Sequence, residues 1–169
     1  MRILMVVLLA VLGYFLLWPV AIDPLAWQAP TDSGYVGSFK PNQALAQGRR
    51  IDIIGGHGPE DVVSDGDGVL YTALADGKIL RIDGGSVTTL GQVPGRILGL
   101  AIGPQQQLYA ADAYRGLLEI DRQRGGATVL LDEVEGKPLV YANNLDVASD
   151  GKIYFSEASS KFGARENGG

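Results

Sequence analysis

Oxygen-bearing side chains that suit a hard metal ion recur where a repeated sequence pattern begins. Glu60 and Asp61 open the first copy of the pattern, and Asn143 opens the third copy. Carboxylate and amide oxygens are the donors that Ca²⁺ and Mg²⁺ prefer. Glu60, Asp61 and Asn143 are therefore candidate metal ligands. A structural role is the alternative, in which Glu60 caps the end of a strand and Asn143 and Asn144 form a turn.

The single histidine of the chain, His57, is a second candidate for chemistry near these residues. Its imidazole would be placed to act as a general base, because Glu60 follows three residues later. Its position in the glycine-rich stretch 55–58 favours an incidental role instead. The same glycines do not form a phosphate-binding loop, because no Gly-Lys-Ser/Thr sequence follows them.

Two further groups of polar residues look functional but have simpler interpretations. Asp65 and Asp67 lack the later glutamate of an EF-hand loop, so we interpret them as turn residues. Ser156, Ser159 and Ser160 have no Gly-x-Ser-x-Gly sequence around them, which argues against a serine-hydrolase nucleophile. Catalytic and substrate-binding residues are therefore not assigned from the sequence.

The composition excludes several classes of function. The chain has 169 residues, no cysteine and a formal net charge of −5 at pH 7. Without cysteine there is no disulfide, no thiol catalysis and no zinc–thiolate site. Nucleic-acid binding requires clustered lysine and arginine, whereas the basic residues here are few and scattered. We therefore expect no nucleic-acid partner.

Three stretches that align without a gap on a tyrosine define the repeat. Tyr109 follows Tyr71 by 38 residues, and Tyr154 follows Tyr109 by 45 residues. Each unit combines short stretches of alternating side chains, as in residues 78–82, with Asp-Gly or Gly-Gly turns. A period of about 40 residues with four strands per unit is typical of a β-propeller blade. The recurring tyrosines predict packing between blades.

The count of units predicts how much of a propeller is present. Residues 58–160 hold about two and a half blades, whereas a closed ring needs about 4–8. We therefore expect an all-β partial propeller and interpret the chain as a partial sequence, a truncated gene or half of a split protein.

Asp112 and Glu157 each follow a recurring tyrosine by three residues. They are expected to join turns or inter-blade hydrogen bonds.

The N-terminal residues predict a single-pass membrane anchor. Residues 3–22 carry no charged side chain, and twenty helical residues span roughly the 30 Å hydrocarbon core of a bilayer. Arg2 precedes this segment and Asp23 follows it, which places the remainder on the exported, periplasmic or extracellular side. A cleaved signal peptide is the alternative, but its apolar region would be shorter and would end at a small-x-small site.

Three regions follow from these patterns. Residues 1–22 are the expected transmembrane signal-anchor. Residues 23–50 are expected to be a linker, because prolines and a turn-rich stretch interrupt any long element. Residues 51–169 are the expected partial propeller.

Several stretches of the chain resemble the strictosidine synthase-like proteins, including their membrane-anchored animal and bacterial members. These stretches are residues 58–61, 108–117, 143–147 and 153–160, and the Asp23-Pro24 segment after the anchor is also similar. The resemblance implies a six-bladed propeller of the gluconolactonase/paraoxonase (senescence marker protein) superfamily. It also implies an active site at the mouth of the central channel.

The resemblance implies relatives of two kinds. Gluconolactonases and paraoxonases are metal-dependent hydrolases of lactones and esters, whereas plant strictosidine synthase condenses an amine with an aldehyde through a glutamate and without metal. That glutamate belongs to a later blade. Glu60 and Asp61 match acidic ligand positions of the metal-dependent pattern, and Asn143 matches its first asparagine ligand. The implied metal is calcium, and its other ligands would come from later blades.

Three functions remain open at this point. The leading hypothesis is a membrane-anchored hydrolase of small-molecule esters or lactones with a divalent metal, inactive as the present fragment. The second is a non-catalytic propeller that serves as a binding platform at the membrane. The third is a metal-free amine–aldehyde condensing lyase.

Overall fold

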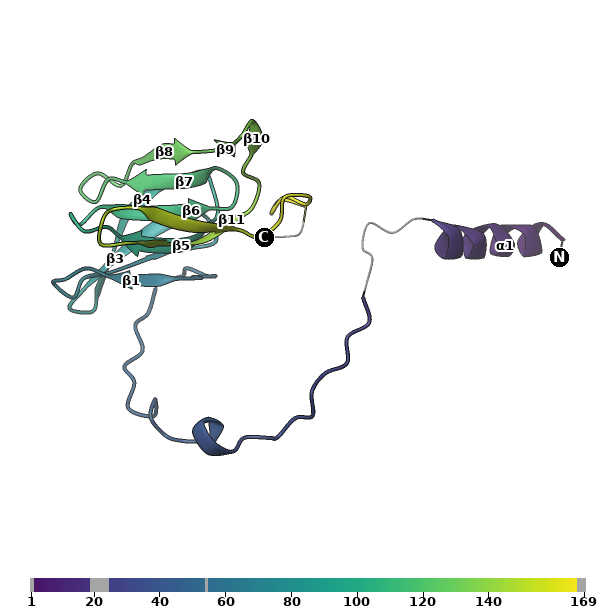
Figure 1. Cartoon of the computed structure of the whole chain (residues 1–169), viewed down its shortest axis with the longest axis horizontal. Helices are drawn as coiled ribbons and strands as arrows, with labels where there is room; N and C mark the ends of the chain where they lie inside the picture. The colour runs from purple at the N-terminus through teal and green to yellow at the C-terminus, as the bar shows by residue number, and fades with distance from the viewer. Residues whose placement is uncertain (1, 19–24, 54, 167–169) are drawn as a thin grey trace. The chain divides into compact units, whose positions relative to one another are not determined.

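The protein divides into two compact units. The computed structural model describes residues 2–18, 25–53 and 55–166 (Figure 1). The first unit covers residues 1–48, and the second covers residues 49–169. Within the first unit, the structure has the helix α1 (Arg2–Leu17) and the short 3₁₀ helix η1 (Gly37–Phe39).

Helix α1 is apolar and exposed along its length. It has 16 residues, and at 1.5 Å per residue it reaches about 24 Å, less than the roughly 30 Å of a bilayer core. Among the residues that the structure describes, no helix is long and apolar enough to cross a membrane. The helix therefore ends before the span expected over residues 1–22 is complete. Residue 1 and residues 19–22 of that expectation lie outside the described part of the chain.

The second unit consists of antiparallel sheets whose strands follow one another in chain order. The first blade is the sheet β1-β2-β3-β4, and the second is the sheet β5-β6-β7-β8. The bounds of the first four strands are β1 (Val62–Ser64), β2 (Leu70–Ala73), β3 (Lys78–Asp83) and β4 (Ser86–Gln92). Those of the next four are β5 (Ile97–Ile102), β6 (Leu108–Asp112), β7 (Gly116–Ile120) and β8 (Ala127–Leu131).

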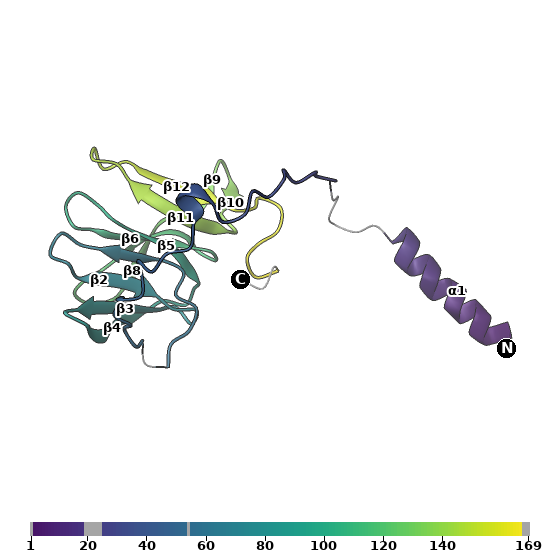
Figure 2. The same cartoon turned by 90° about the horizontal axis from the view of Figure 1, so that it is seen from below.

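A third sheet begins after a small hairpin. The hairpin consists of β9 (Glu133–Val134) and β10 (Lys137–Pro138), and the third sheet pairs β11 (Ala142–Val147) with β12 (Ile153–Glu157). The first strands of the three sheets are neighbours, since β5 contacts both β1 and β11. Figure 2 shows the sheets stacked face to face. The predicted all-β architecture of consecutive four-stranded units is confirmed.

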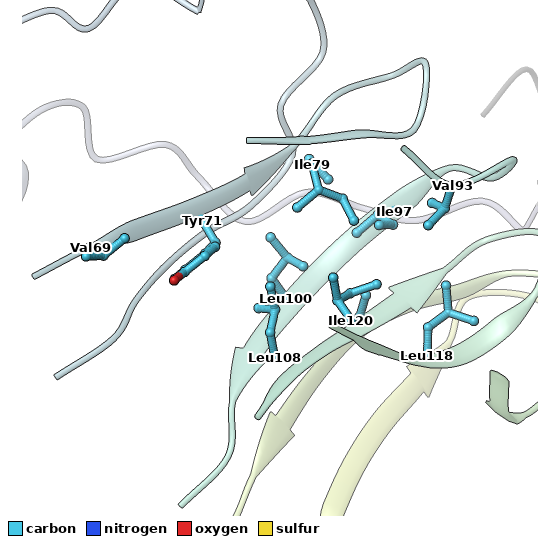
Figure 3. Packing of buried hydrophobic residues seen from close by; sticks show 11 residues of the cluster. Val69, Tyr71, Ile79, Val93, Ile97, Leu100, Leu108, Leu118 and Ile120 are labelled. Carbon is cyan, nitrogen blue, oxygen red and sulfur yellow. The ribbon is translucent and has the colours of Figure 1, made fainter. Parts of the chain in front are cut away.

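The hydrophobic core lies between the sheets rather than within one of them. Tyr71, Ile79 and Val69 of the first blade pack against Leu100 and Leu108 of the second (Figure 3). A second cluster joins the second blade to the third. Each sheet is too thin to bury its own apolar face, so stacking on the next sheet supplies the burial.

The recurring tyrosines follow this pattern of stacking. Tyr71 is only 2% exposed, and Tyr109 packs in the cluster between the second and third blades. Burial, aided by the negative charge of Glu119, raises the pKa of the Tyr109 phenol. Tyr154 is 64% exposed, because no described element packs on that face of the third sheet. Tyr71 and Tyr109 thus bear out the expected packing between blades.

An arginine fixes the first two blades at the end opposite to the strand starts of β1 and β5. Arg122, in the turn between β7 and β8, forms an ion pair with the buried carboxylate of Asp65. It also donates to the Tyr71 hydroxyl at 2.8 Å and to the carbonyl of Gln106 at 2.8 Å. Asp65 accepts the backbone N–H groups of Asp67 and Val69, as the turn interpretation requires. The turn interpretation did not include the burial of Asp65 or its ion pair with Arg122.

Candidate functional site

A polar cavity lies where the first strands of the three sheets begin. Its volume is about 400 Å³, and its lining includes the three residues that the sequence singles out, Glu60, Asp61 and Asn143. The remaining lining residues are Arg96, Leu98, Tyr141 and Asn144. Glu60 and Asp61 stand just before β1, and Asn143 lies at the start of β11. The repeated pattern therefore brings residues 83 positions apart in the chain to one cavity.

The carboxylate of Glu60 is paired with an arginine of the next blade. Arg96, in the turn before β5, donates from Nη2 to Glu60 Oε1 at 2.5 Å and from Nη1 to the Gly58 carbonyl at 2.9 Å. The Arg96 side chain is 11% exposed, and that of Glu60 is 49% exposed. The ion pair therefore joins the first two blades at the cavity.

Asp61 links the same two blades through backbone N–H groups. Its Oδ1 accepts the N–H of Val62 at 2.8 Å, and its Oδ2 accepts the N–H of Leu100 at 2.8 Å. Its carbonyl also accepts the Thr72 hydroxyl at 2.6 Å. Both carboxylate oxygens of Asp61 thus accept backbone N–H groups, one at the start of β1 and one within β5.

The two asparagines of the third blade differ in their surroundings. Asn144 Oδ1 accepts the N–H of Leu145 at 2.8 Å, and the Asn144 N–H donates to the Ser156 hydroxyl at 3.2 Å. Asn143 is half-buried and lines the cavity. Asn144 therefore stabilises the local backbone, whereas Asn143 offers an amide to the cavity.

A buried carboxylate supports the turn that carries Arg96. Asp112 is fully buried, and its Oδ1 accepts the N–H of Arg96 at 3.3 Å and the N–H of Tyr114 at 2.8 Å. A side chain at Gly95 would overlap the Asp112 carboxylate, so the turn requires glycine there. Asp112 Oδ2 has no hydrogen-bond partner among the described residues. The strand-end position of Asp112 thus sets the path of the chain into β5.

Glu157 repeats this arrangement in the third blade. Its Oε1 accepts the N–H groups of Val140 and Tyr141, at 2.8 and 2.7 Å, in the segment that enters β11. Both acidic residues follow a recurring tyrosine, and both organise the entry into the first strand of their own blade. The turn role expected for Asp112 and Glu157 agrees with these bonds.

The cavity offers fewer free oxygen donors than a hard divalent cation requires. Ca²⁺ takes 6–8 oxygen ligands. Glu60 Oε2 and the side-chain amide oxygen of Asn143 are suitable donors, but Arg96 holds Glu60 Oε1 and backbone N–H groups engage both oxygens of Asp61. Within the described residues, no group of three or more His, Cys, Asp or Glu side chains is placed to hold a metal. Glu60 and Asn143 would supply part of a metal site.

The other residues considered for chemistry are not among those that line the cavity. His57 is exposed, is absent from the cavity lining, and accepts the Ala75 N–H through its backbone carbonyl. Ser156 accepts the Asn144 N–H, and Ser159 accepts the N–H groups of Lys161 and Phe162.

Arg96 is the functional residue that sequence reasoning missed. It stands two positions before Leu98, the second-blade counterpart of Glu60 and Asn143. The signal available in the sequence was a single arginine at the entrance to an aligned strand. No pattern in the chain pairs it with a carboxylate 36 residues earlier.

Comparisons with known proteins agree with this architecture. Residues 37–82 match the family described as "Strictosidine synthase-like, N-terminal". Adipocyte plasma membrane-associated protein of Rattus norvegicus is 34% identical, and the match covers 92% of this chain and 46% of that protein. Strictosidine synthase-like protein 3 of Arabidopsis thaliana is 31% identical, covering 75% of this chain and 39% of that protein. The chain spans about half the length, or less, of these curated relatives.

A solved structure supports the same fold. A gluconolactonase from Xanthomonas campestris superposes with a TM-score of 0.50 and 29% sequence identity, covering 54% of this chain and 31% of that chain. The stacked four-stranded sheets and the polar cavity at their strand starts define a protein of the β-propeller class. The chain is therefore similar to the strictosidine synthase-like proteins, and its sheets resemble those of the gluconolactonase-type propellers.

Proposed function

We propose that this chain forms one side of the active site of a six-bladed propeller that hydrolyses small-molecule esters or lactones. The observation that carries the proposal is the polar cavity shared by Glu60, Asp61 and Asn143, at the strand starts of three successive blades. The likeness to a gluconolactonase structure supports a lactone as the substrate class.

The proposal includes a divalent metal, for which calcium is our first choice. Glu60 and Asn143 would hold it from this chain, together with Asp61 if its oxygens are shared with the backbone. A bound divalent ion polarises the carbonyl oxygen of an ester or lactone. The chain's own residues orient the site: Asp61 fixes the start of β1 against β5, and Arg96 fixes Glu60.

We further propose that the isolated chain has no hydrolase activity. It spans less than half of the curated relative from Rattus norvegicus, so the remaining ligands of a metal would come from further blades. The oxygen donors that line the cavity fall short of the 6–8 oxygens of a calcium site.

A non-catalytic binding platform is the second candidate, and one observation favours it. The charged groups that line the cavity are engaged in structural interactions, since Glu60 pairs with Arg96 and Asp61 binds backbone N–H groups. A propeller whose cavity residues all serve to hold blades together would present its surface for binding without catalysis.

The test uses a protein in which these 169 residues are followed by the remaining blades. We expect hydrolysis of phenyl acetate or a small lactone that requires Ca²⁺, stops with EDTA, and falls at least 100-fold in Asn143→Ala and Glu60→Ala. Asp150→Ala, in an exposed turn of the same blade as Asn143, is the control and should retain activity. Rates that are unaffected by EDTA and by both cavity substitutions would refute the metal-dependent hydrolase and favour the binding platform.

A further inference from the structure

Arg96 places a fixed positive charge on the carboxylate that a metal would need. Its guanidinium lies between the Gly58 carbonyl and Glu60, and its side chain is only 11% exposed. A charge-assisted hydrogen bond in a partly dry site is stronger than one at the surface. The negative charge of Glu60 is therefore already balanced by the positive charge of Arg96.

Arg96 is held through its backbone as well as through its guanidinium. Its N–H donates to buried Asp112, and its carbonyl accepts the Ala113 N–H at 2.8 Å. The guanidinium also lies beside Gly58, where an added Cβ would be in contact with Arg96 Nη1 at 3.4 Å. A side chain anchored in this way loses little conformational freedom on pairing, so the ion pair is preorganised.

A divalent cation bound at Glu60 would stand within a few ångströms of this guanidinium. Like charges at such a separation repel strongly where water is partly excluded. The metal would therefore have to displace Arg96 from Glu60, or to bind only through the second oxygen. The cavity offers Arg96 one other carboxylate, Asp61, whose oxygens already accept two backbone N–H groups.

We infer that Arg96 is an internal counter-ion that masks a divalent-cation site at Glu60 and Asn143, so that metal and arginine compete for one carboxylate. The inference rests on the metal part of the proposed function. Removal of the guanidinium frees both oxygens of Glu60 beside the Asn143 amide in a cavity of about 400 Å³, which has room for an ion and several waters.

The experiment measures Ca²⁺ binding to the full chain by calorimetry at low ionic strength. Arg96→Met should bind Ca²⁺ at least tenfold more tightly than the unaltered chain. The gain should disappear in the double variant Arg96→Met/Glu60→Gln, because the unmasked ligand is then absent. Arg122→Met is the matched control, since it also removes an arginine that joins the first two blades but lies at their other end. It should leave the Ca²⁺ affinity unchanged.

Two results would overturn the inference. One is an unaltered chain that binds Ca²⁺ as tightly as Arg96→Met, including the case in which neither binds it. The other is a gain that survives Glu60→Gln. Arg96→Gln serves if the methionine variant does not fold. NMR of the arginine Nη resonances in the unaltered chain gives an independent reading, because saturating Ca²⁺ should break the Arg96–Glu60 hydrogen bond.

The two proposals fail in different ways. If the unaltered chain binds Ca²⁺ tightly and through Glu60, the masking by Arg96 is refuted, whereas the metal-dependent hydrolase is not. If calorimetry confirms the masking but the completed propeller shows no hydrolysis, the hydrolase proposal is refuted. The competition between Arg96 and the metal is then still supported.

Discussion

At the scale of single residues, two arginines of the second blade make contact with the first blade at opposite ends. Arg96 pairs with Glu60 at the cavity, where the carboxylate is half exposed. Arg122 pairs with Asp65, whose side chain is 3% exposed. The same residue type thus has two different energetic roles, because removal of a partner from a buried carboxylate costs far more than removal from an exposed one.

Replacement of Arg122 by methionine is expected to destabilise the propeller unit by about 3 kcal/mol, the low end for breaking a buried ion pair. The low end applies because Asp65 Oδ1 keeps its two backbone N–H partners. Urea denaturation followed by circular dichroism measures the loss. Lys152→Met, which removes an exposed pair with Asp150, is the control and should cost less than about 1 kcal/mol. Equal losses in both variants would contradict the role given to Arg122.

At the scale of elements, the turns between strands contain aspartates whose pKa is lowered by one of two main causes, a lysine side chain or backbone N–H groups. The Lys78 ammonium, which donates to the Asp76 carboxylate, lowers the pKa of Asp76, and Lys152 lowers that of Asp150 in the same way. Backbone N–H groups of Gln123 and Arg124 lower the pKa of Asp121. A hydrogen bond or charge that favours the ionised form has this sign wherever it occurs.

These three carboxyl groups should titrate below their ordinary value in the folded protein. Their folded pKa is depressed, so the stability they contribute is present above the unfolded pKa and is lost as the pH falls through the folded pKa. Carboxyl ¹³C NMR between pH 2 and 6 measures the titrations. In 1 M NaCl the shifts of Asp76 and Asp150 should shrink, because salt screens the lysine charge, while that of Asp121 persists. Equal salt sensitivity at all three sites would contradict this division of causes.

The elements were predictable from the sequence to the extent that they depend on local patterns. The Asp-Gly turns and the alternation of residues 78–82 predict the strands, and the spacing of the tyrosines predicts the sheets and their stacking. The gapless alignment also predicts that Glu60 and Asn143 meet. It could not predict that Arg96 occupies Glu60, because side-chain pairing between blades depends on the turn geometry that Asp112 and Gly95 impose.

At the scale of the whole molecule, the apolar helix α1 suits a lipid surface. All apolar side chains described in α1 are exposed, and a long exposed apolar surface is costly in water. The relative from Rattus norvegicus is named as plasma membrane-associated. We propose that residues 1–22 anchor the protein to the membrane and that the propeller lies on the exported side.

Deletion of residues 1–22 should move the protein from the membrane fraction to the supernatant. The measurement is fractionation after carbonate washing, which retains anchored proteins, combined with protease treatment of intact cells or spheroplasts to find the side of the propeller. Tyr35→Ala, in the linker, is the control and should not change the fractionation. Full release of the unaltered protein by carbonate would argue against an anchor, and protection of the propeller from protease would argue against export.

The contact between Arg122 and Tyr71 also implies a delay during synthesis, because it cannot form until the ribosome has made residue 122. The two residues are 51 positions apart, so at about 5–20 residues per second the ribosome needs roughly 3–10 s to deliver the arginine after the tyrosine. For the first part of that interval the apolar face of the first blade has no partner, because Leu100 and Leu108 of the second blade also follow Tyr71 in the chain. The nascent chain therefore passes through a period in which its first blade is a target for chaperones, and slow translation before residue 122 would lengthen that exposure.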